Sequence, residues 1–147
     1  MHLDDVSKAI IEQLQQDGRR SYAAIGKVVG LSEAAVRQRV QRLIDGGVMQ
    51  VVAVTDPLEL GFARQAMVGV RVQGPLEPVA DALTALDEVD YVVITAGSFD
   101  LLVEVVCESD DHLLDLIDRI RSIEGVSSTE TFMYLQLRKQ TYTWGVR

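Results

Sequence analysis

Cysteine is almost absent from this sequence: Cys107 is the only one, so the chain can form no internal disulfide. Histidine is nearly as rare, and neither His2 nor His112 has a neighbour at the spacing of a metal site or a catalytic triad. No apolar run approaches the roughly 20 residues of a membrane span, and the acidic N-terminus lacks the pattern of a signal peptide. These absences predict a cytoplasmic protein with no bound metal and no cofactor, in which Cys107 is a small core residue.

Motifs of common enzymes are missing as well. The sequence has no glycine-rich phosphate loop, and Ser98 does not lie in a Gly-x-Ser-x-Gly elbow. We therefore predict that the protein is not an enzyme and has no catalytic residues.

Positive charge is scarce overall, since the formal net charge is −8 at pH 7. A net acidic chain is by itself a poor candidate for nucleic-acid binding, because phosphate contacts require clustered cations. The distribution changes that view. Residues 1–50 hold seven Lys and Arg against six acids, a net charge of +1, whereas residues 51–147 hold seven against sixteen, a net charge of −9. This asymmetry predicts different partners for the two segments.

Apolar residues at helical spacing predict three helices in the first fifty residues. The first ends at Asp17-Gly18, and the second runs from a capping Ser21 to Gly30. The third begins after the capping Ser32 and ends at Gly46-Gly47. Its predicted core face consists of Val36, Val40, Leu43 and Ile44. Because Gly30 lies in the tight connection between the last two helices, the segment is typical of a helix-turn-helix.

A β-branched run at 48–56 predicts a strand that serves as a hinge. Beyond it, strands are predicted at 66–73, 91–96, 99–107 and 126 to about 138. One helix is predicted to start at Pro75 and Pro78, and a second to span 110–123. Gly97-Ser98 is a two-residue connection, which predicts an antiparallel hairpin. The predicted fold class is α+β, with a helix-turn-helix (winged-helix-like) domain at 1–48, a hinge strand and linker at 49–62, and a ferredoxin-like βαββαβ domain at 63–147.

Both faces of the predicted sheet are apolar. Helices in this topology cover one face only, so the other face should be polar if it met water. Instead, the strands carry apolar residues at consecutive positions, namely Val92, Val93 and Ile94, then Leu101, Leu102 and Val103, then Phe132, Met133, Tyr134 and Leu135. Because no further chain is available to cover the second face, we predict an obligate homodimer.

The outward face of the third helix is the candidate DNA-reading surface. Arg and Gln side chains match the guanine and adenine edges in the major groove, and small residues at the helix start allow close approach. The candidate DNA-binding residues are Ser32, Glu33, Ala34, Arg37, Gln38, Arg39, Gln41 and Arg42. An ordinary solvated helix face is the alternative, but three arginines on one helix beside an N-terminal three-helix unit favour binding to double-stranded DNA.

Several motifs, taken in order, carry a family resemblance. They are Leu3-Asp4-Asp5, Asp17-Gly18-Arg19, Val29-Gly30-Leu31-Ser32, Arg39-Val40-Gln41-Arg42-Leu43, Gly46-Gly47-Val48-Met49, Asp56-Pro57, Leu60-Gly61 and Gly97-Ser98-Phe99-Asp100. Together they resemble the Lrp/AsnC (feast/famine) family and cover nearly the whole chain. The resemblance implies a sequence-specific DNA-binding transcription regulator. Many relatives have Pro and a small polar pair where this chain has Glu33-Ala34-Ala35, so the operator sequence does not transfer.

The resemblance also implies an effector site and further assembly. Dimers of the family often associate, commonly as octamers, and bind an amino acid or a related metabolite where dimers meet. Gly97, Ser98 and Asp100 could supply backbone N–H groups for a carboxylate and an acceptor for an ammonium. The family's pocket-lining positions fall on Val93, Phe99, Met133 and Tyr134. A second interpretation stays open beside the effector site. In it, Asp100 only secures the hairpin turn and the aromatic residues pack at an interface.

Two other functions are compatible with this architecture. A DNA-architectural protein would compact DNA without sensing a ligand. The two-module architecture also resembles that of the sirohaem decarboxylases. Those enzymes depend on histidines in the α/β module, where this sequence has only His112. The C-terminal segment Tyr142–Arg147 has no assignment from sequence, since it could be a disordered end or could pack across subunits.

Overall fold

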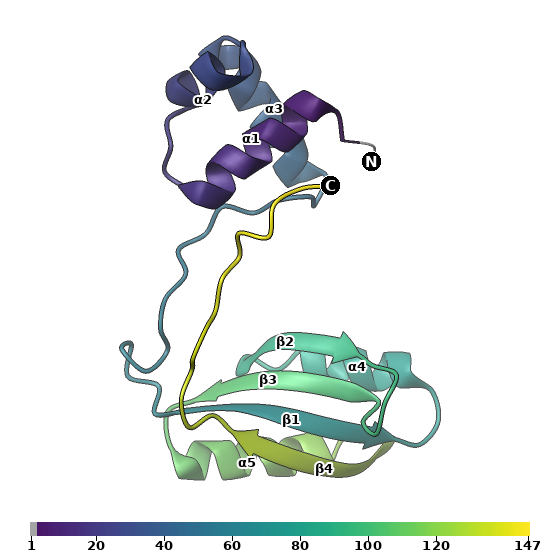
Figure 1. Ribbon diagram of the computed structural model, residues 1–147. Coiled ribbons are helices and arrows are strands. Elements are labelled where there is room, and N and C mark those ends of the chain that lie inside the picture. The colour runs from purple at the N-terminus through teal and green to yellow at the C-terminus, as the bar shows by residue number, and fades with distance from the viewer. Residues whose placement is uncertain (1–2) are drawn as a thin grey trace. The chain divides into compact units, whose positions relative to one another are not determined.

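The computed structural model describes residues 3–147, which form two compact units (Figure 1). The first unit, called the head, contains the chain up to Val54 together with Arg138–Arg147. The second unit, called the module, contains Thr55–Leu137. Among residues 3–147, no helix is both long enough and apolar enough to span a membrane.

The head consists of three helices, which are α1 (Asp5–Gln16), α2 (Tyr22–Val29) and α3 (Glu33–Asp45). The predicted caps Ser21 and Ser32 are confirmed, because each side chain accepts a hydrogen bond from a backbone N–H in the first turn of the helix that it precedes. Asp4 caps α1 in the same way. The buried core of the head contains Ile10, Leu14, Ile25, Val36 and Val40. Ile44, predicted to be a core residue, is 36% exposed, because it lies in the last turn of α3 at the edge of this small core.

A buried glycine sets the spacing between α2 and α3. A Cβ atom on Gly26 would lie 2.4 Å from the carbonyl oxygen of Leu31, which is backbone and cannot rotate away. We therefore expect Gly26→Ala to destabilise the head by about 1–3 kcal/mol, the usual cost of overpacking. Thermal unfolding measures this loss. Gly18→Ala is the matched control, since its Cβ would meet nothing closer than 3.9 Å. Equal stability of the two variants would show that the turn can open without cost.

The predicted hinge strand does not form within this chain. Residues 49–63 contain no strand, and Val51, Val52 and Val54 are 49%, 68% and 62% exposed. A β-branched run favours an extended backbone, but a strand also needs a neighbour for its backbone hydrogen bonds. No such neighbour occurs among residues 3–147.

The module is a four-stranded antiparallel sheet with two helices on one face, which confirms the predicted ferredoxin-like βαββαβ fold. Its elements are β1 (Arg64–Val72), α4 (Leu76–Thr84), β2 (Val89–Ile94), β3 (Leu101–Cys107), α5 (Asp110–Arg121) and β4 (Val126–Met133), with strand order β2-β3-β1-β4. Two predicted boundaries are wrong. The hairpin connection is six residues, 95–100, instead of two, and β4 ends at Met133 instead of near 138.

The consecutive apolar residues of the strands divide cleanly between two faces. Along β3, burial alternates, so that Leu101, Val103, Val105 and Cys107 are fully buried beneath the helices. Leu83, Leu116 and Ile120 of α4 and α5 complete this core. Leu102, Glu104 and Val106 point to the opposite side, which no helix covers and which we call the open face.

Candidate functional site

Seven of the eight candidate DNA-binding residues are exposed on α3 or at its start. They are Ser32, Glu33, Ala34, Arg37, Gln38, Gln41 and Arg42. Arg39 is half-buried. The buried residues Val36, Val40 and Leu43 lie on the other side of the helix. The helix therefore presents a mainly polar surface that contains two exposed arginines and two glutamines.

Arg37 is held in a defined position by two neighbours. Its Nη2 donates to Glu33 Oε1 at 2.9 Å, one helical turn earlier. Its guanidinium also lies over the ring of Tyr22 from α2, 5.2 Å from the centroid. Both contacts are solvent-exposed and contribute little to stability. They restrict the conformations of Arg37 and leave other N–H donors of the guanidinium for an acceptor such as a guanine edge.

Arg39 has a different environment. Its Nη1 donates to Asp4 Oδ2 at 2.7 Å and to Ser7 Oγ at 3.1 Å, joining α3 to the start of α1. The Arg39 hydrogen bond, helped by those from Ser7, holds the pKa of Asp4 well below its usual range. An arginine already bound to a carboxylate is less available for DNA, so this geometry favours a positioning role for Arg39 within the head.

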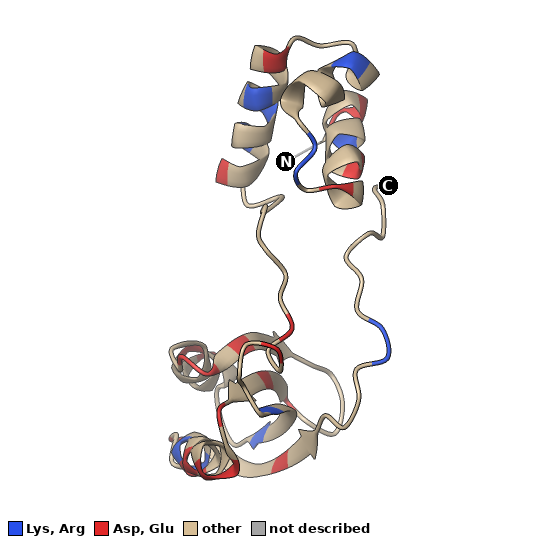
Figure 2. Cartoon of the chain, turned by 90° about the vertical axis from the view of Figure 1, so that its left-hand side faces the viewer, with Lys and Arg blue, Asp and Glu red and all other residues tan. Residues whose placement is uncertain are grey.

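Cations occur on all three helices of the head, as Figure 2 shows in blue, whereas acidic residues are spread over the module. Lys8 lies on α1, Lys27 on α2, and Arg37, Arg39 and Arg42 on α3. This distribution matches the charge asymmetry of the sequence, and cations are the groups that phosphate contacts require.

The hairpin connection 95–100 is a structured loop. The Asp100 N–H donates to Val70 O, and Asp100 Oδ2 accepts from the Val72 N–H at 2.8 Å, so this carboxylate fixes the loop to β1. Thr95 Oγ1 donates to Phe99 O at 2.6 Å. Gly97 and Ser98 are exposed, and their N–H groups have no partner among residues 3–147. Asp100 therefore does secure the turn, and its Oδ1 remains for a second partner.

Arg71 is a loop contact that sequence reasoning missed. Its Nε donates to Ser98 O at 2.9 Å, and its guanidinium stacks on the Phe99 ring at 4.4 Å. The ring occupies the space above Gly69, where a Cβ would lie 2.7 Å from ring atoms. The only sequence signal for this contact was an isolated arginine two residues after a glycine in a predicted strand. The partner of Arg71, Ser98, lies 27 residues further along the chain.

The seven candidate effector residues do not converge within one chain. Gly97, Ser98, Phe99 and Asp100 lie beside the end of β1, since Asp100 pairs with Val70. Met133 pairs with Ala66, and the Tyr134 N–H donates to Gln65 O, at the start of β1. The two groups are thus four to five residues apart along β1, from Val70 to Ala66 and Gln65, or roughly 13–17 Å at strand rise. Val93 lies on the open face across from Leu102, near the loop end.

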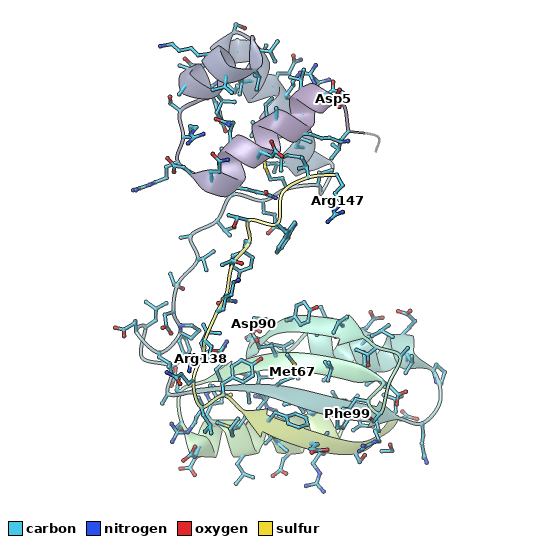
Figure 3. The ribbon with its side chains drawn as sticks, viewed as in Figure 1. Asp5, Met67, Asp90, Phe99, Arg138 and Arg147 are labelled. Carbon is cyan, nitrogen blue, oxygen red and sulfur yellow. The ribbon has the colours of Figure 1, made fainter. Side chains whose placement is uncertain are left out.

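The open face carries apolar side chains around a polar centre. Met67, Val93, Leu102, Val106 and Phe132 point to this side, as the strand pairing requires. Figure 3 labels Met67 and Phe99 on it. Phe99 and Phe132 meet edge to face at 5.9 Å. An uncovered surface of this kind is typical of a protein interface.

Glu104 is the acidic centre of the open face and was not identified from sequence. Tyr134 Oη donates to Glu104 Oε2 at 2.6 Å, and Gln65 Nε2 donates to Glu104 Oε1 at 3.3 Å. Partial burial and the nearby Glu104 charge raise the pKa of Asp90 to about 6. The same two causes, together with its hydrogen bond to Glu104, raise the pKa of Tyr134 above its ordinary value.

His112 is part of a structural network. Its Nε2 lies 3.0 Å from Glu88 Oε1, and its Nδ1 accepts from the Glu108 N–H at 3.3 Å. Arg119 also binds Glu88. Mainly because of the His112 hydrogen bond, and despite partial burial, the pKa of Glu88 falls to about 2. Among residues 3–147, no group of His, Cys, Asp or Glu could hold a metal ion, and His2 lies outside the described residues.

Comparison with known families assigns both parts of the chain. Residues 3–44 match the AsnC-type helix-turn-helix domain, and residues 62–147 match a C-terminal dimeric alpha+beta barrel domain of AsnC-type regulators. The HTH-type transcriptional regulator FL11 of Pyrococcus furiosus is 36% identical over 141 residues, which cover 95% of this chain and 93% of that protein.

Two solved structures extend the comparison. The leucine response regulatory protein LrpA of Mycobacterium tuberculosis has a TM-score of 0.85 and 30% identity, over 94% of this chain and 96% of that one. A transcriptional regulator from Neisseria meningitidis, solved as a complex with L-methionine, has a TM-score of 0.81 and 23% identity, over 97% of this chain and 96% of that one. The second likeness is one of fold.

Proposed function

The chain belongs to the Lrp/AsnC family of DNA-binding transcription regulators, and we propose that an amino acid or a related small carboxylate, bound at the loop 95–100, controls its assembly or its affinity for DNA. As in the regulators it resembles, the helix-turn-helix is the DNA-binding part, and the protein is not an enzyme. The observation that carries the proposal is the pair of exposed, unpartnered N–H groups at Gly97 and Ser98 beside the Asp100 carboxylate.

The open face is proposed as the homodimer interface. The family domain that residues 62–147 match is described as dimeric. The apolar side chains around Met67 and Leu102 would be removed from water by a second copy, which is the main driving force of such association. Each dimer then carries two α3 helices for two half-sites about one helical turn apart on the duplex.

We propose that the candidate effector residues come together only when residues of more than one chain form the site. The loop 97–100 and the pair Met133 and Tyr134 lie beside different ends of β1, with their backbones roughly 13–17 Å apart. This backbone separation is longer than a single amino acid. Contact between dimers, with octamers as the expected assembly, could join the loop of one chain to the β4 end of another. The L-methionine complex of the Neisseria regulator supports a ligand of this size and chemistry.

Substituting Asp100 with asparagine separates its two roles. Asparagine keeps an oxygen that can accept from the Val72 N–H, so the loop should keep its conformation. It removes the negative charge that would pair with an ammonium group. We expect the variant to lose at least roughly tenfold in ligand affinity, in line with the strength of a hydrogen bond to a charged group. Calorimetry with the amino acid that most raises the thermal stability of the wild type measures this loss.

Two results would redirect this proposal. Unchanged ligand affinity in Asp100→Asn would mean that Asp100 is only a turn residue. If no amino acid or keto acid stabilises the wild type while DNA binding is intact, the architectural function without ligand sensing becomes the better description. Glu108→Asn is a suitable control, because it removes an exposed acid next to β3 without touching the loop.

A further inference from the structure

The C-terminal segment Arg138–Arg147 forms one compact unit with the head, although the residues directly before it belong to the module. The chain therefore passes between the two units twice, once after Val54 and once after Leu137. We propose that this segment is a structural part of the DNA-binding head, docked on α1 of its own chain through Gln15, and that it forms a second, non-covalent link between module and head. Arg138 and Arg147 mark its two ends in Figure 3.

The contact is a two-way pairing between one side-chain amide and one backbone residue. The Gly145 N–H donates to Gln15 Oε1 at 3.1 Å, and Gln15 Nε2 donates to Gly145 O at 3.4 Å. A primary amide is the side-chain group that can satisfy both a backbone donor and a backbone acceptor of the same residue. Gln15 is itself half-buried, so its amide is held near the helix surface.

The conformation of Gly145 makes the pairing depend on sequence. Its φ is +78°, a region that glycine adopts freely and that costs other residues about 1 kcal/mol or more. Gly145 and Val146 are half-buried, whereas the preceding residues 141–144 are exposed. Burial is thus confined to the residues at the Gln15 contact, as expected of a specific docking point.

The charge of the segment fits this location. It contains Arg138, Lys139 and Arg147 and no acid. Together with the net +1 of residues 1–54, these three cations bring the net charge of the head to +4. A more positive head attracts DNA more strongly.

A second link has a mechanical consequence. Residues 134–137 follow directly after β4, so the docked segment connects the end of this strand to α1 by a route that does not include the linker after Val54. Helix α1 is in turn joined to the DNA-reading helix through Asp4 and Arg39. Two tethers also restrict the positions available to the head more than one tether does.

Trp144 is the only tryptophan and adjoins the docking residue, so its fluorescence reports on the segment directly. We expect time-resolved anisotropy of the full-length protein to show Trp144 moving largely with the head. Gln15→Ala should at least double the amplitude of the fast local motion, and Gly145→Ala should act in the same direction. Gln16→Ala is the matched control, being an exposed glutamine at the next position of α1 with no such contact.

Cross-linking distinguishes docking on the same chain from docking on a partner. Cysteines at Gln16→Cys and Arg147→Cys flank the contact, and the native Cys107 is fully buried. A short bismaleimide should close a loop within one chain without doubling the mass on a denaturing gel. A product of doubled mass would overturn docking on the chain's own α1, and Gln15→Ala anisotropy equal to that of Gln16→Ala would overturn the contact itself. Neither readout requires DNA or an effector, so the result is independent of the proposed sensing function.

Discussion

Substituting Leu102 with arginine should convert the protein from a dimer to a monomer. Leu102 lies in the middle of the open face, paired with Gly69 on one side and Val93 on the other. If a second copy covers this face, the arginine would be buried without a partner in both chains. An uncompensated buried charge costs about 3–5 kcal/mol, so the dimer dissociation constant should rise at least roughly a hundredfold to thousandfold. Sedimentation across a concentration series measures it.

Loss of the dimer should also weaken DNA binding, because a monomer brings one α3 helix to a two-part site. Leu114→Arg is the matched control, since Leu114 is a leucine of α5 that is 60% exposed and lies on the helical side of the module. Unchanged far-ultraviolet circular dichroism would show that both variants are folded. A Leu102→Arg protein that remains dimeric at wild-type affinity would rule out the open face as the interface.

The elements that sequence predicted well are those fixed by local chemistry. The capping hydrogen bonds of Ser21 and Ser32 span three residues, so the sequence contains both partners within one helical turn. The burial of Cys107 follows from alternation along a single strand. In each case the deciding interaction lies within a few residues of the motif.

The features that sequence missed depend on contacts between distant residues. Arg39 is bound by Asp4, which lies 35 residues away, so helical periodicity could only place Arg39 on a flank of α3. Glu104 interrupts an apolar run, but its partner Tyr134 is 30 residues further along the chain. The strand predicted at 48–56 does not form for a related reason, because strand propensity cannot supply a neighbouring strand.

The candidate effector residues show a second limit. The family resemblance placed the loop residues and Met133 and Tyr134 in one group, yet strand register separates the two sets along β1 within one chain. Sequence alone cannot tell a site within one subunit from a site shared between subunits. Their separation is what makes assembly and sensing physically connected in the proposed function.

Arg37→Ala should produce the largest loss of sequence discrimination in the head. Arg37 is exposed at 64% of its side chain, and Glu33 and Tyr22 hold it in place. A bidentate contact from arginine to a guanine edge contributes about 1–3 kcal/mol of discrimination. We therefore expect affinity for a selected operator to fall roughly five- to 150-fold while affinity for random duplex changes much less. Titration of each protein with the operator and with the random duplex, at one fixed salt concentration, gives the two affinities.

Two further substitutions separate base reading from other roles. Lys27→Ala removes a cation from the last turn of α2 and should weaken operator and random duplex alike, as loss of a phosphate contact does. Arg39→Ala breaks the pair with Asp4 and Ser7, so it should lower the thermal stability of the head more than it changes base preference. If Arg37→Ala instead behaves like Lys27→Ala, with equal losses on both duplexes, then Arg37 contacts the backbone and a different α3 residue, Gln38 first among them, reads the bases.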